Sequence, residues 1–320
     1  MAYLAGGLIE ATDYNGFVST NAANVNAVWG EGSTDSGWGQ SALATVSVGG
    51  LVTATQWSSL VNTISSMAGQ TGTTVTSRTA PVAGNTIEIL AALNTDITNI
   101  TANRLNAVAN GSQFTGWTGT NSKTGTTSGA TWTITFTNTV TWSSAAAARY
   151  FFNAGGRIRI DVSKTAVGAL GDPEWNDLAN TLCGDVFITG GTATQTIAGT
   201  NYTGTTRIGG TGSPSILATT TGWYDLTPGA AATVVYRQFA DTAPYTNNFI
   251  QHSIARSADS TQLIITTLWS ASDGDPISGG TASSGATPGT APTTIVTYFP
   301  PSTTFLTNSW GTPTVAATTT

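Results

Sequence analysis

An alternation of polar and apolar side chains over residues 131–142 is the feature that most limits how this chain can fold. Every odd position from Thr131 to Thr141 is a threonine. The even positions, apart from one asparagine, carry large apolar side chains, namely Trp132, Ile134, Phe136, Val140 and Trp142. A period of two places one face of a β-strand in a core and the other face in water. The pattern therefore predicts a strand of a half-buried sheet.

The residues that follow predict two further strands. Residues 148–152 read Ala-Arg-Tyr-Phe-Phe, and residues 153–156 read Asn-Ala-Gly-Gly, a composition typical of a tight reversal. Residues 157–162 alternate again as Arg-Ile-Arg-Ile-Asp-Val. We therefore expect three antiparallel strands within residues 130–162, with two tryptophans on the inner face.

Short β-type segments also occupy most of the C-terminal part of the chain. We expect strands over residues 185–189, 233–239, 249–256, 261–269 and 293–299, with residues 257–260 as a hairpin loop. Residues 106–129, 190–212 and 272–292 are rich in glycine, threonine and serine and are predicted to be connections. A short helix is expected where Asp172 precedes Pro173. About eight strands without alternating helices favour an antiparallel sandwich.

The N-terminal third predicts three amphipathic helices. The first lies within residues 14–29, and the second follows a Thr53–Gln56 capping box. The third follows Pro81 and carries a heptad-like stripe. The stripe is compatible with a core shared by the three helices. It is also compatible with pairing between copies of the chain, for which the candidate interface residues are Leu90, Leu93, Ile97 and Ile100.

The predicted fold is therefore α+β and mainly β, with a small N-terminal helical region followed by an antiparallel β-sandwich. We place an N-terminal helical docking and oligomerisation region at residues 1–112, the sandwich at residues 113–299 and an extended C-terminal tail at residues 300–320. Phe305, Leu306 and Trp310 indicate that this tail packs on another surface, such as that of a neighbouring subunit.

Charge is scarce in this chain. Charged residues make up 8% of the sequence, against roughly 25% in ordinary soluble domains, and the net charge is −6. Long-range attraction to nucleic acid or to an anionic membrane is therefore not expected. The first ten residues resemble no secretory signal, and no apolar run approaches the ~20 residues of a membrane span. Neutral polar residues replace the missing charge, as is common in extracellular, adhesive and virion proteins.

Few residues in the sequence point to chemistry, and we expect no catalytic, cofactor or metal site. His252 and Cys183 are each unique and far apart, which argues against a zinc site or a serine triad. The acidic group Asp172, Glu174 and Asp177 is the alternative for glycoside hydrolysis, and Asp273 with Asp275 is the alternative for calcium.

One aromatic pair is a candidate for carbohydrate binding. Trp223 and Tyr224 precede an aspartate in a loop-like segment. An aromatic ring beside a carboxylate can hold a sugar by stacking and hydrogen bonding, which makes these two residues candidate glycan contacts. Burial under an edge of the sandwich is the competing interpretation.

Several phrases resemble those of virion structural proteins of tailed bacteriophages. One is Arg-Tyr-Phe-Phe-Asn-Ala-Gly-Gly at residues 149–156, after a strand rich in Trp and Thr. Others are Tyr-Asn-Gly-Phe at residues 14–17, Val-Trp-Gly-Glu-Gly at 28–32, Gly-Trp-Gly-Gln at 37–40 and Val-Thr-Ala-Thr-Gln-Trp at 52–57. Many relatives have tyrosine at the position of Trp38. The resemblance extends from about Leu8 to Ile160 and is weak beyond that point.

The resemblance implies a non-enzymatic part of a phage particle, such as a tail, neck or baseplate appendage. The expected partners are other copies of the chain, preferably as a trimer, and other virion proteins. Such a protein is assembled in the host cytoplasm and becomes extracellular after lysis. The alternatives are a receptor- or carbohydrate-binding module on the particle, and a polysaccharide depolymerase.

Overall fold

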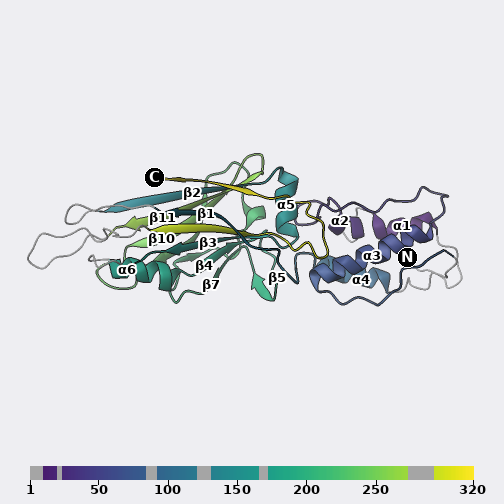
Figure 1. Cartoon of the computed structure of the whole chain (residues 1–320), viewed down its shortest axis with the longest axis horizontal. Helices are drawn as coiled ribbons and strands as arrows, with labels where there is room; N and C mark the ends of the chain where they lie inside the picture. Colours follow the sequence, from purple (N-terminus) through teal and green to yellow (C-terminus); the bar gives the residue numbers. More distant parts are fainter. Residues whose placement is uncertain (1–9, 20–23, 84–91, 121–130, 166–171, 273–291) are drawn as a thin grey trace, which may run out of the picture.

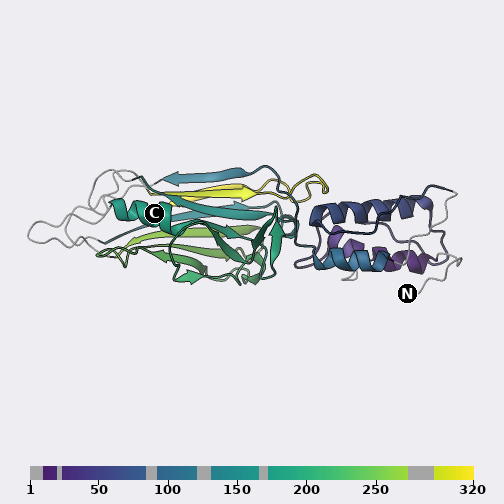
Figure 2. The ribbon, with the colours of Figure 1, turned by 90° about the horizontal axis from the view of Figure 1, so that it is seen from below.

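Helices α1–α4 lie together at one end of an elongated molecule, and the strands form the other end (Figure 1). The computed structural model describes residues 10–19, 24–83, 92–120, 131–165, 172–272 and 292–320. The four helices are α1 (Ala11–Val18), α2 (Val25–Trp29), α3 (Ala54–Thr71) and α4 (Leu93–Ala102). The narrow part of the molecule between the helices and the strands is called the waist below (Figure 2).

The strands form two sheets that face each other across a common core. The first sheet has the order β1 (Phe114–Thr120), β12 (Thr293–Phe299), β3 (Arg157–Ser163), β4 (Asp185–Ile188) and β7 (Thr205–Ile208). The second has the order β13 (Thr314–Thr319), β2 (Trp132–Thr141), β11 (Gln262–Ala271), β10 (Phe249–Arg256), β9 (Thr233–Phe239) and β8 (Ile216–Leu217). Neighbouring strands are antiparallel in both sheets, which confirms the predicted α+β, mainly β sandwich.

Shorter elements complete the β region. A small hairpin of β5 (Gln195–Ile197) and β6 (Thr200–Tyr202) lies near the waist. Helix α5 (Ala145–Asn153) also lies at the waist end, whereas α6 (Asp172–Asp177) and the π-helix η1 (Leu178–Cys183) follow β3. The 3₁₀-helix η2 (Trp223–Asp225) lies between β8 and β9.

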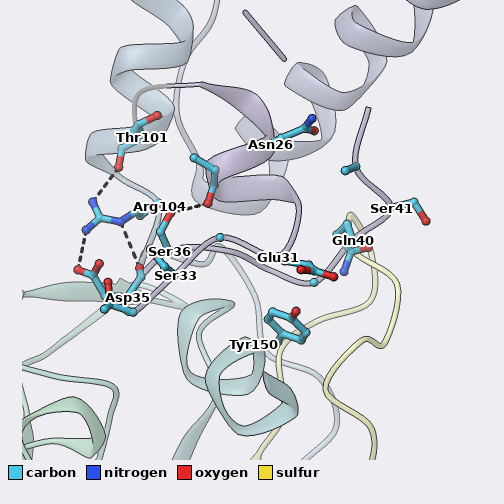
Figure 3. A pocket seen from close by; sticks show the side chains of 15 residues that line it. Asn26, Glu31, Ser33, Asp35, Ser36, Gln40, Ser41, Thr101, Arg104 and Tyr150 are labelled. Carbon is cyan, nitrogen blue, oxygen red and sulfur yellow. Dashed lines mark hydrogen bonds and ion pairs between the residues drawn. The ribbon is translucent and has the colours of Figure 1, made fainter. Parts of the chain in front are cut away.

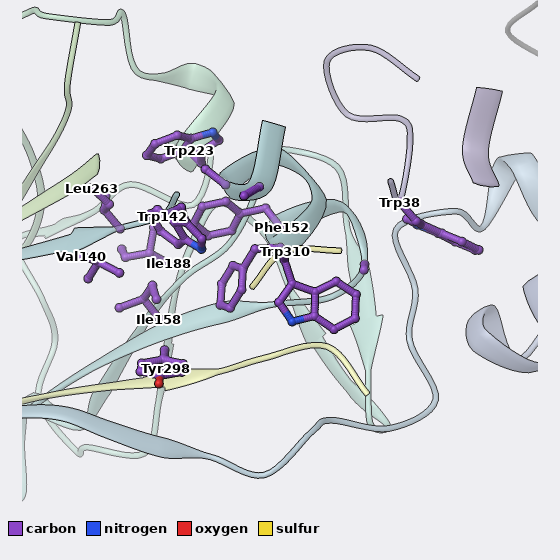
Figure 4. Packing of buried hydrophobic residues seen from close by; sticks show 14 of the residues in the cluster. Trp38, Val140, Trp142, Phe152, Ile158, Ile188, Trp223, Leu263, Tyr298 and Trp310 are labelled. Carbon is purple, nitrogen blue, oxygen red and sulfur yellow. The ribbon is translucent and has the colours of Figure 1, made fainter. Parts of the chain in front are cut away.

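Strand β2 follows the predicted alternation. Ile134, Phe136 and Val140 are buried, and the threonines between them are partly or fully exposed. Just beyond the strand, Trp142 packs on Phe151, Phe152 and Trp223 with ring centroids 5.3–5.5 Å apart (Figure 4). Buried aromatic area of this kind is a large source of stability, and this cluster closes the waist end of the sandwich.

The prediction of a strand over residues 148–152 is wrong. These residues belong to α5, where Ser144 Oγ accepts a hydrogen bond from the Ala147 amide (3.0 Å) and so caps the helix. Four consecutive alanines favour the helix. Because α5 is buried between the sheets and the waist, aromatic residues on adjacent positions can both be buried. Strands β2 and β3 consequently lie in different sheets and not in one meander.

The C-terminal tail is not a separate extended segment. Residues 302–312 run along the waist, where Leu306 and Trp310 are buried, and β13 then pairs with β2 of the same chain. The apolar residues of the tail therefore pack on their own chain, not on a neighbour. Strand β1 and the β5–β6 hairpin also replace two of the predicted connections.

The helical region is confirmed in its main features. Thr53 Oγ1 accepts a hydrogen bond from the Gln56 amide, and Gln56 Oε1 accepts one from the Thr53 amide, so α3 begins with the predicted capping box. Tyr14 of α1 packs edge to face on Trp57 of α3, with ring centroids 5.6 Å apart. The first predicted helix is divided into α1 and α2.

Candidate functional site

A cleft of about 1060 Å³ opens at the waist (Figure 3). One wall is the segment of residues 30–40, called the joint loop below. The opposite walls come from α2, from the end of α4 and from Tyr150 of α5. Most of the side chains that line the cleft are polar, including Asn26, Glu31, Asp35, Gln40 and Arg104.

The joint loop has an unusual backbone. Gly32, Gly37 and Gly39 have φ angles of +54°, +98° and +67°, and Thr34 has φ +47°. A positive φ is strained for a β-branched residue and persists only where the surroundings hold it. At Gly37, a Cβ atom would lie 2.0 Å from the Glu31 carbonyl oxygen. The loop therefore requires glycine at these positions, because a side chain would be strained by the positive φ or would clash with the backbone.

Asn153, at the end of α5, holds this loop in place. Its Nδ2 donates to the carbonyl oxygens of Thr34 (3.2 Å) and Gly37 (3.0 Å), and its Oδ1 accepts from the Tyr224 hydroxyl (2.7 Å). The backbone oxygen of Asn153 accepts from Trp38 Nε1 at 3.1 Å. The Asn153 side chain is fully buried, so each of these bonds would be costly to lose.

Two arginines hold the remaining parts of the loop. The Arg104 guanidinium pairs with the Asp35 carboxylate at 2.6 Å and also donates to the Asp35 and Thr101 carbonyl oxygens (3.2 and 3.1 Å). Arg149 donates to the Ser36 carbonyl oxygen at 3.1 Å. The charged groups of Arg104 and Asp35 are thus occupied with each other. Glu31 is exposed at the mouth of the cleft.

The C-terminal tail also bonds to the joint loop. Gln40 Oε1 accepts hydrogen bonds from the Thr307 amide and hydroxyl (2.8 and 2.7 Å), and Gln40 Nε2 donates to the Thr307 carbonyl oxygen (3.0 Å). The Ser309 hydroxyl donates to the Trp38 carbonyl oxygen at 2.6 Å. The loop is therefore held by Arg104, by α5 and by the tail, and it connects the helices to the sandwich as a structural joint.

The predicted oligomer interface is placed differently by the structure. Leu93, Ile97 and Ile100 are buried in the chain's own helical core, so they are not exposed for pairing with copies of the chain. Leu90 lies outside the described residues. The heptad-like spacing reflects packing of α4 inside one molecule, which was the competing interpretation.

The predicted glycan contacts are also corrected. Trp223 is completely buried in the aromatic cluster of the sandwich, so its ring cannot stack on a sugar. Tyr224 is half-buried and lines a small hollow of about 170 Å³ together with Asp35, Gln195 and Asp225. Its hydroxyl is engaged by Asn153, and burial raises the pKa of Tyr224.

The single histidine and cysteine are core residues. The His252 ring stacks on Tyr236 with centroids 5.3 Å apart, and its Nδ1 lies 3.0 Å from Thr267 Oγ1. Burial lowers the pKa of His252 to about 3, so the ring is neutral. Burial raises the pKa of the Cys183 thiol to about 12, which leaves it un-ionised and weakly reactive at neutral pH.

The structure describes only part of the acidic candidates. Burial is the main cause of a raised pKa at Glu174, with a contribution from the charges of Asp177 and Asp241. The Asp172 side chain and both Asp273 and Asp275 lie outside the described part of the chain. Within the described ranges, no three His, Cys, Asp or Glu side chains come close enough to hold a metal ion.

The chain was compared with known protein families, curated proteins and solved structures. No protein-family profile, curated protein or solved structure matched it. None of the helices in the described residues is both long enough and apolar enough to cross a bilayer.

The sequence does not reveal the contacts that build the joint. Asn153 belongs to a predicted turn and to the phrase at residues 149–156, but neither pattern indicates its partners, and Arg104 carries no pattern. The one available signal was the Gly-Trp-Gly-Gln phrase at residues 37–40, whose glycines indicate a tightly constrained backbone.

Proposed function

We propose that this chain is a non-enzymatic structural component of a tailed-phage particle, in a tail, neck or baseplate appendage, and that it acts by assembling with other subunits. Its helical region attaches the protein to the particle, and its sandwich forms the projecting body. The particle is assembled in the host cytoplasm and released by lysis.

The phrases that resemble phage virion proteins support this proposal, because two of them meet at the joint. Residues 37–40 and 149–156 contact each other through Trp38, Asn153 and Tyr150, whose ring faces Gly39. A tyrosine, as in many relatives, also carries a hydrogen-bond donor at the end of a flat ring and suits the position of Trp38. These two sequence segments thus form the joint between the helical region, which we propose as the attachment site, and the sandwich.

The observation that carries the proposal is a group of exposed apolar residues at the free end of the helical region. Val48, Leu51 and Val82 are 90%, 87% and 66% exposed. The first two lie at a turn just before α3. Val82 follows Pro81, whose carbonyl oxygen accepts a hydrogen bond from Ser58, the fifth residue of α3. The opposite end of α3 reaches the waist, where Gln70 Nε2 donates to the Ala154 carbonyl oxygen.

Such a group, called the apolar tip here, marks a contact surface. Large apolar side chains exposed together are typical of interaction sites. The tip belongs to the part of the chain that resembles other virion proteins, whereas the resemblance weakens along the sandwich. We therefore propose that the tip binds another virion protein, one that is common to the particles of the proteins that this chain resembles. We expect several copies of the chain, preferably three, to be arranged around that protein.

The proposal is tested by following the protein into particles. A phage that encodes the chain is purified, and the protein is quantified in the particles by mass spectrometry and located by labelled antibodies. We expect a fixed copy number per particle and a single location. The double variant Val48→Ser and Leu51→Ser should be incorporated at least about tenfold less, because it removes the apolar contact area.

The matched control is Ile208→Ser, which changes an exposed apolar residue on the sandwich. It should be incorporated like the parent protein. The proposal is wrong if the protein occurs in infected cells but is missing from purified particles. The role of the tip is wrong if the double variant enters particles as efficiently as the parent.

A further inference from the structure

A second hollow at the waist lies between the start of β1 and the C-terminal tail. Its volume is about 230 Å³, slightly below the usual range of roughly 300–1,000 Å³ for drug-sized ligands. It is lined by Gly111, Ser112, Phe114, Tyr298, Pro300, Pro301, Thr303, Asn308, Trp310, Gly311 and Thr312. The size suits a ligand with a single ring.

Aromatic rings form the apolar wall of this pocket. Phe114 is 49% exposed and stacks on Tyr298, with ring centroids 5.4 Å apart and planes 23° apart. Trp310 of the tail is 1% exposed and also lines the pocket. Exposing half of a phenylalanine ring to water is unfavourable, so a ligand with an apolar face would be stabilised by covering it.

Neutral hydrogen-bonding groups form the rest of the rim. Ser112, Thr303, Asn308 and Thr312 are exposed, and their side chains form no hydrogen bond with any described residue. They provide three hydroxyls and one amide for a ligand. The one titratable group in the lining is Tyr298, and burial raises its pKa, so its hydroxyl stays protonated at neutral pH.

We infer that this pocket binds one unit of a neutral sugar. A pyranose ring presents C–H groups on one face, which can pack on Phe114, and hydroxyls around its edge, which can pair with the amide and hydroxyls of the rim. A charged ligand would lose water without gaining a countercharge. A purely apolar ligand would leave the rim groups without partners.

This inference goes beyond the proposed function, because the pocket is at the waist and the apolar tip is at the far end of the helices. Sugar binding can therefore be present or absent independently of assembly. The aromatic residue proposed to contact a glycan is therefore Phe114, which is partly exposed, and not Trp223, which is buried.

Saturation-transfer NMR on the full chain provides the test. The probes are the methyl α-glycosides of glucose, galactose, mannose and N-acetylglucosamine, with N-acetylneuraminic acid as a charged comparison. We expect transfer to at least one neutral sugar and none to the charged one. Phe114→Ala and Asn308→Ala should each weaken binding by about tenfold or more.

Ile208→Ala is the control, because it also shortens an exposed apolar side chain but lies on β7. It should bind like the parent. Both pocket residues are exposed, so dispersed methyl signals should verify that each variant is folded. Absence of transfer to every neutral sugar overturns the inference, and so does equal binding by both pocket variants. Equal binding of the charged sugar or preferential binding of an uncharged peptide also overturns it.

Discussion

Asn153 shows how much structure a single buried amide can fix. Its side chain uses both the donor and the acceptor end, and its partners are Thr34, Gly37 and Tyr224. The bond to Gly37 joins residues 116 positions apart in the sequence. A leucine of similar size would leave the Gly37 carbonyl oxygen unpaired in a buried place, at a cost of about 1–3 kcal/mol, whereas the Tyr224 hydroxyl keeps a hydrogen bond to the Arg149 carbonyl oxygen (3.4 Å).

His252 is the residue from which we predict a pH-dependent loss of stability. Its pKa is about 3 in the folded chain, because burial disfavours the charged ring, against about 6.5 when unfolded. The folded state therefore binds fewer protons, and the stabilising effect of the neutral ring is complete above pH 6.5. As the pH falls from about 6.5 towards 3, it is lost at up to ~1.4 kcal/mol per pH unit.

The measurement is urea unfolding of the parent and of His252→Gln at pH 7, 6 and 5. The ring faces Tyr236 and Thr267, neither of which ionises in this range. The parent should lose stability faster than the variant as the pH falls, and the difference isolates His252 from the carboxylates. Parallel pH profiles for the two proteins would show that His252 is not the titrating group.

At the scale of elements, β13 shows how the C-terminal tail is held. Thr135 and Thr320 exchange both backbone hydrogen bonds, at 2.7 and 2.9 Å. In an antiparallel ladder, hydrogen-bonded and non-hydrogen-bonded pairs alternate. Ala316, opposite Thr139, is therefore in a hydrogen-bonded pair, and Ala317, opposite Asn138, is not.

This alternation predicts different effects for proline at two adjacent positions. Ala316→Pro removes an amide that bonds to β2 and should destabilise the chain by about 1–3 kcal/mol, because the partner carbonyl oxygen on β2 loses its hydrogen bond. Ala317→Pro has the same composition but its amide points away from β2, so it should cost clearly less. Thermal unfolding of both variants is the measurement. Equal destabilisation, or a larger loss in Ala317→Pro, would contradict the assigned register.

The elements that the sequence predicted well are those specified by local chemistry. Strands β9 and β12 have the predicted bounds, and α3 begins at its capping box. The sequence predicts neither strand β13 nor helix α5, for different reasons. The tail contains only a weak alternation of small residues. In α5, the Tyr-Phe-Phe run favours a strand, although a serine cap and four alanines precede it.

Other features could not be predicted because they depend on contacts between remote segments. Alternation shows which face of a strand is buried, but not which strand lies beside it. The pairing of β3 with β12 and of β2 with β13 follows only from the folded chain. The joint is not predictable either, because its contacts join remote residues. Arg104, for example, pairs with Asp35, which is 69 positions away in the sequence.

At the scale of the whole molecule, the helices and the sandwich share one continuous core. The same buried cluster includes Trp57 and Leu93 of the helical region and Trp142 of the sandwich. Trp38 lies between these groups, where it packs on Trp29 and donates a hydrogen bond to Asn153 (Figure 4). In the proposed role, a stiff joint would fix the direction in which the sandwich projects from the particle.

The last prediction is that this joint is stiff in solution and that Asn153 makes it so. Spin labels are attached at Asn62→Cys on α3 and Asn201→Cys on β6, both exposed positions on either side of the waist. The native Cys183 is buried and remains unlabelled. Pulsed electron paramagnetic resonance should give one narrow distance distribution. Asn153→Ala should broaden it, because Thr34 and Gly37 of the joint loop lose their hydrogen bonds to the Asn153 side chain.

The fold should survive this substitution, since a loss of about 1–3 kcal/mol for a buried polar group is small beside a typical stability of about 5–15 kcal/mol. The matched control is Asn94→Ala, an exposed asparagine in α4 that makes no contact with the waist; it should keep the narrow distribution. A broad distribution in the parent would mean that the helices and the sandwich move independently. A narrow one in Asn153→Ala would mean that the tail and Arg104 are sufficient to hold the joint.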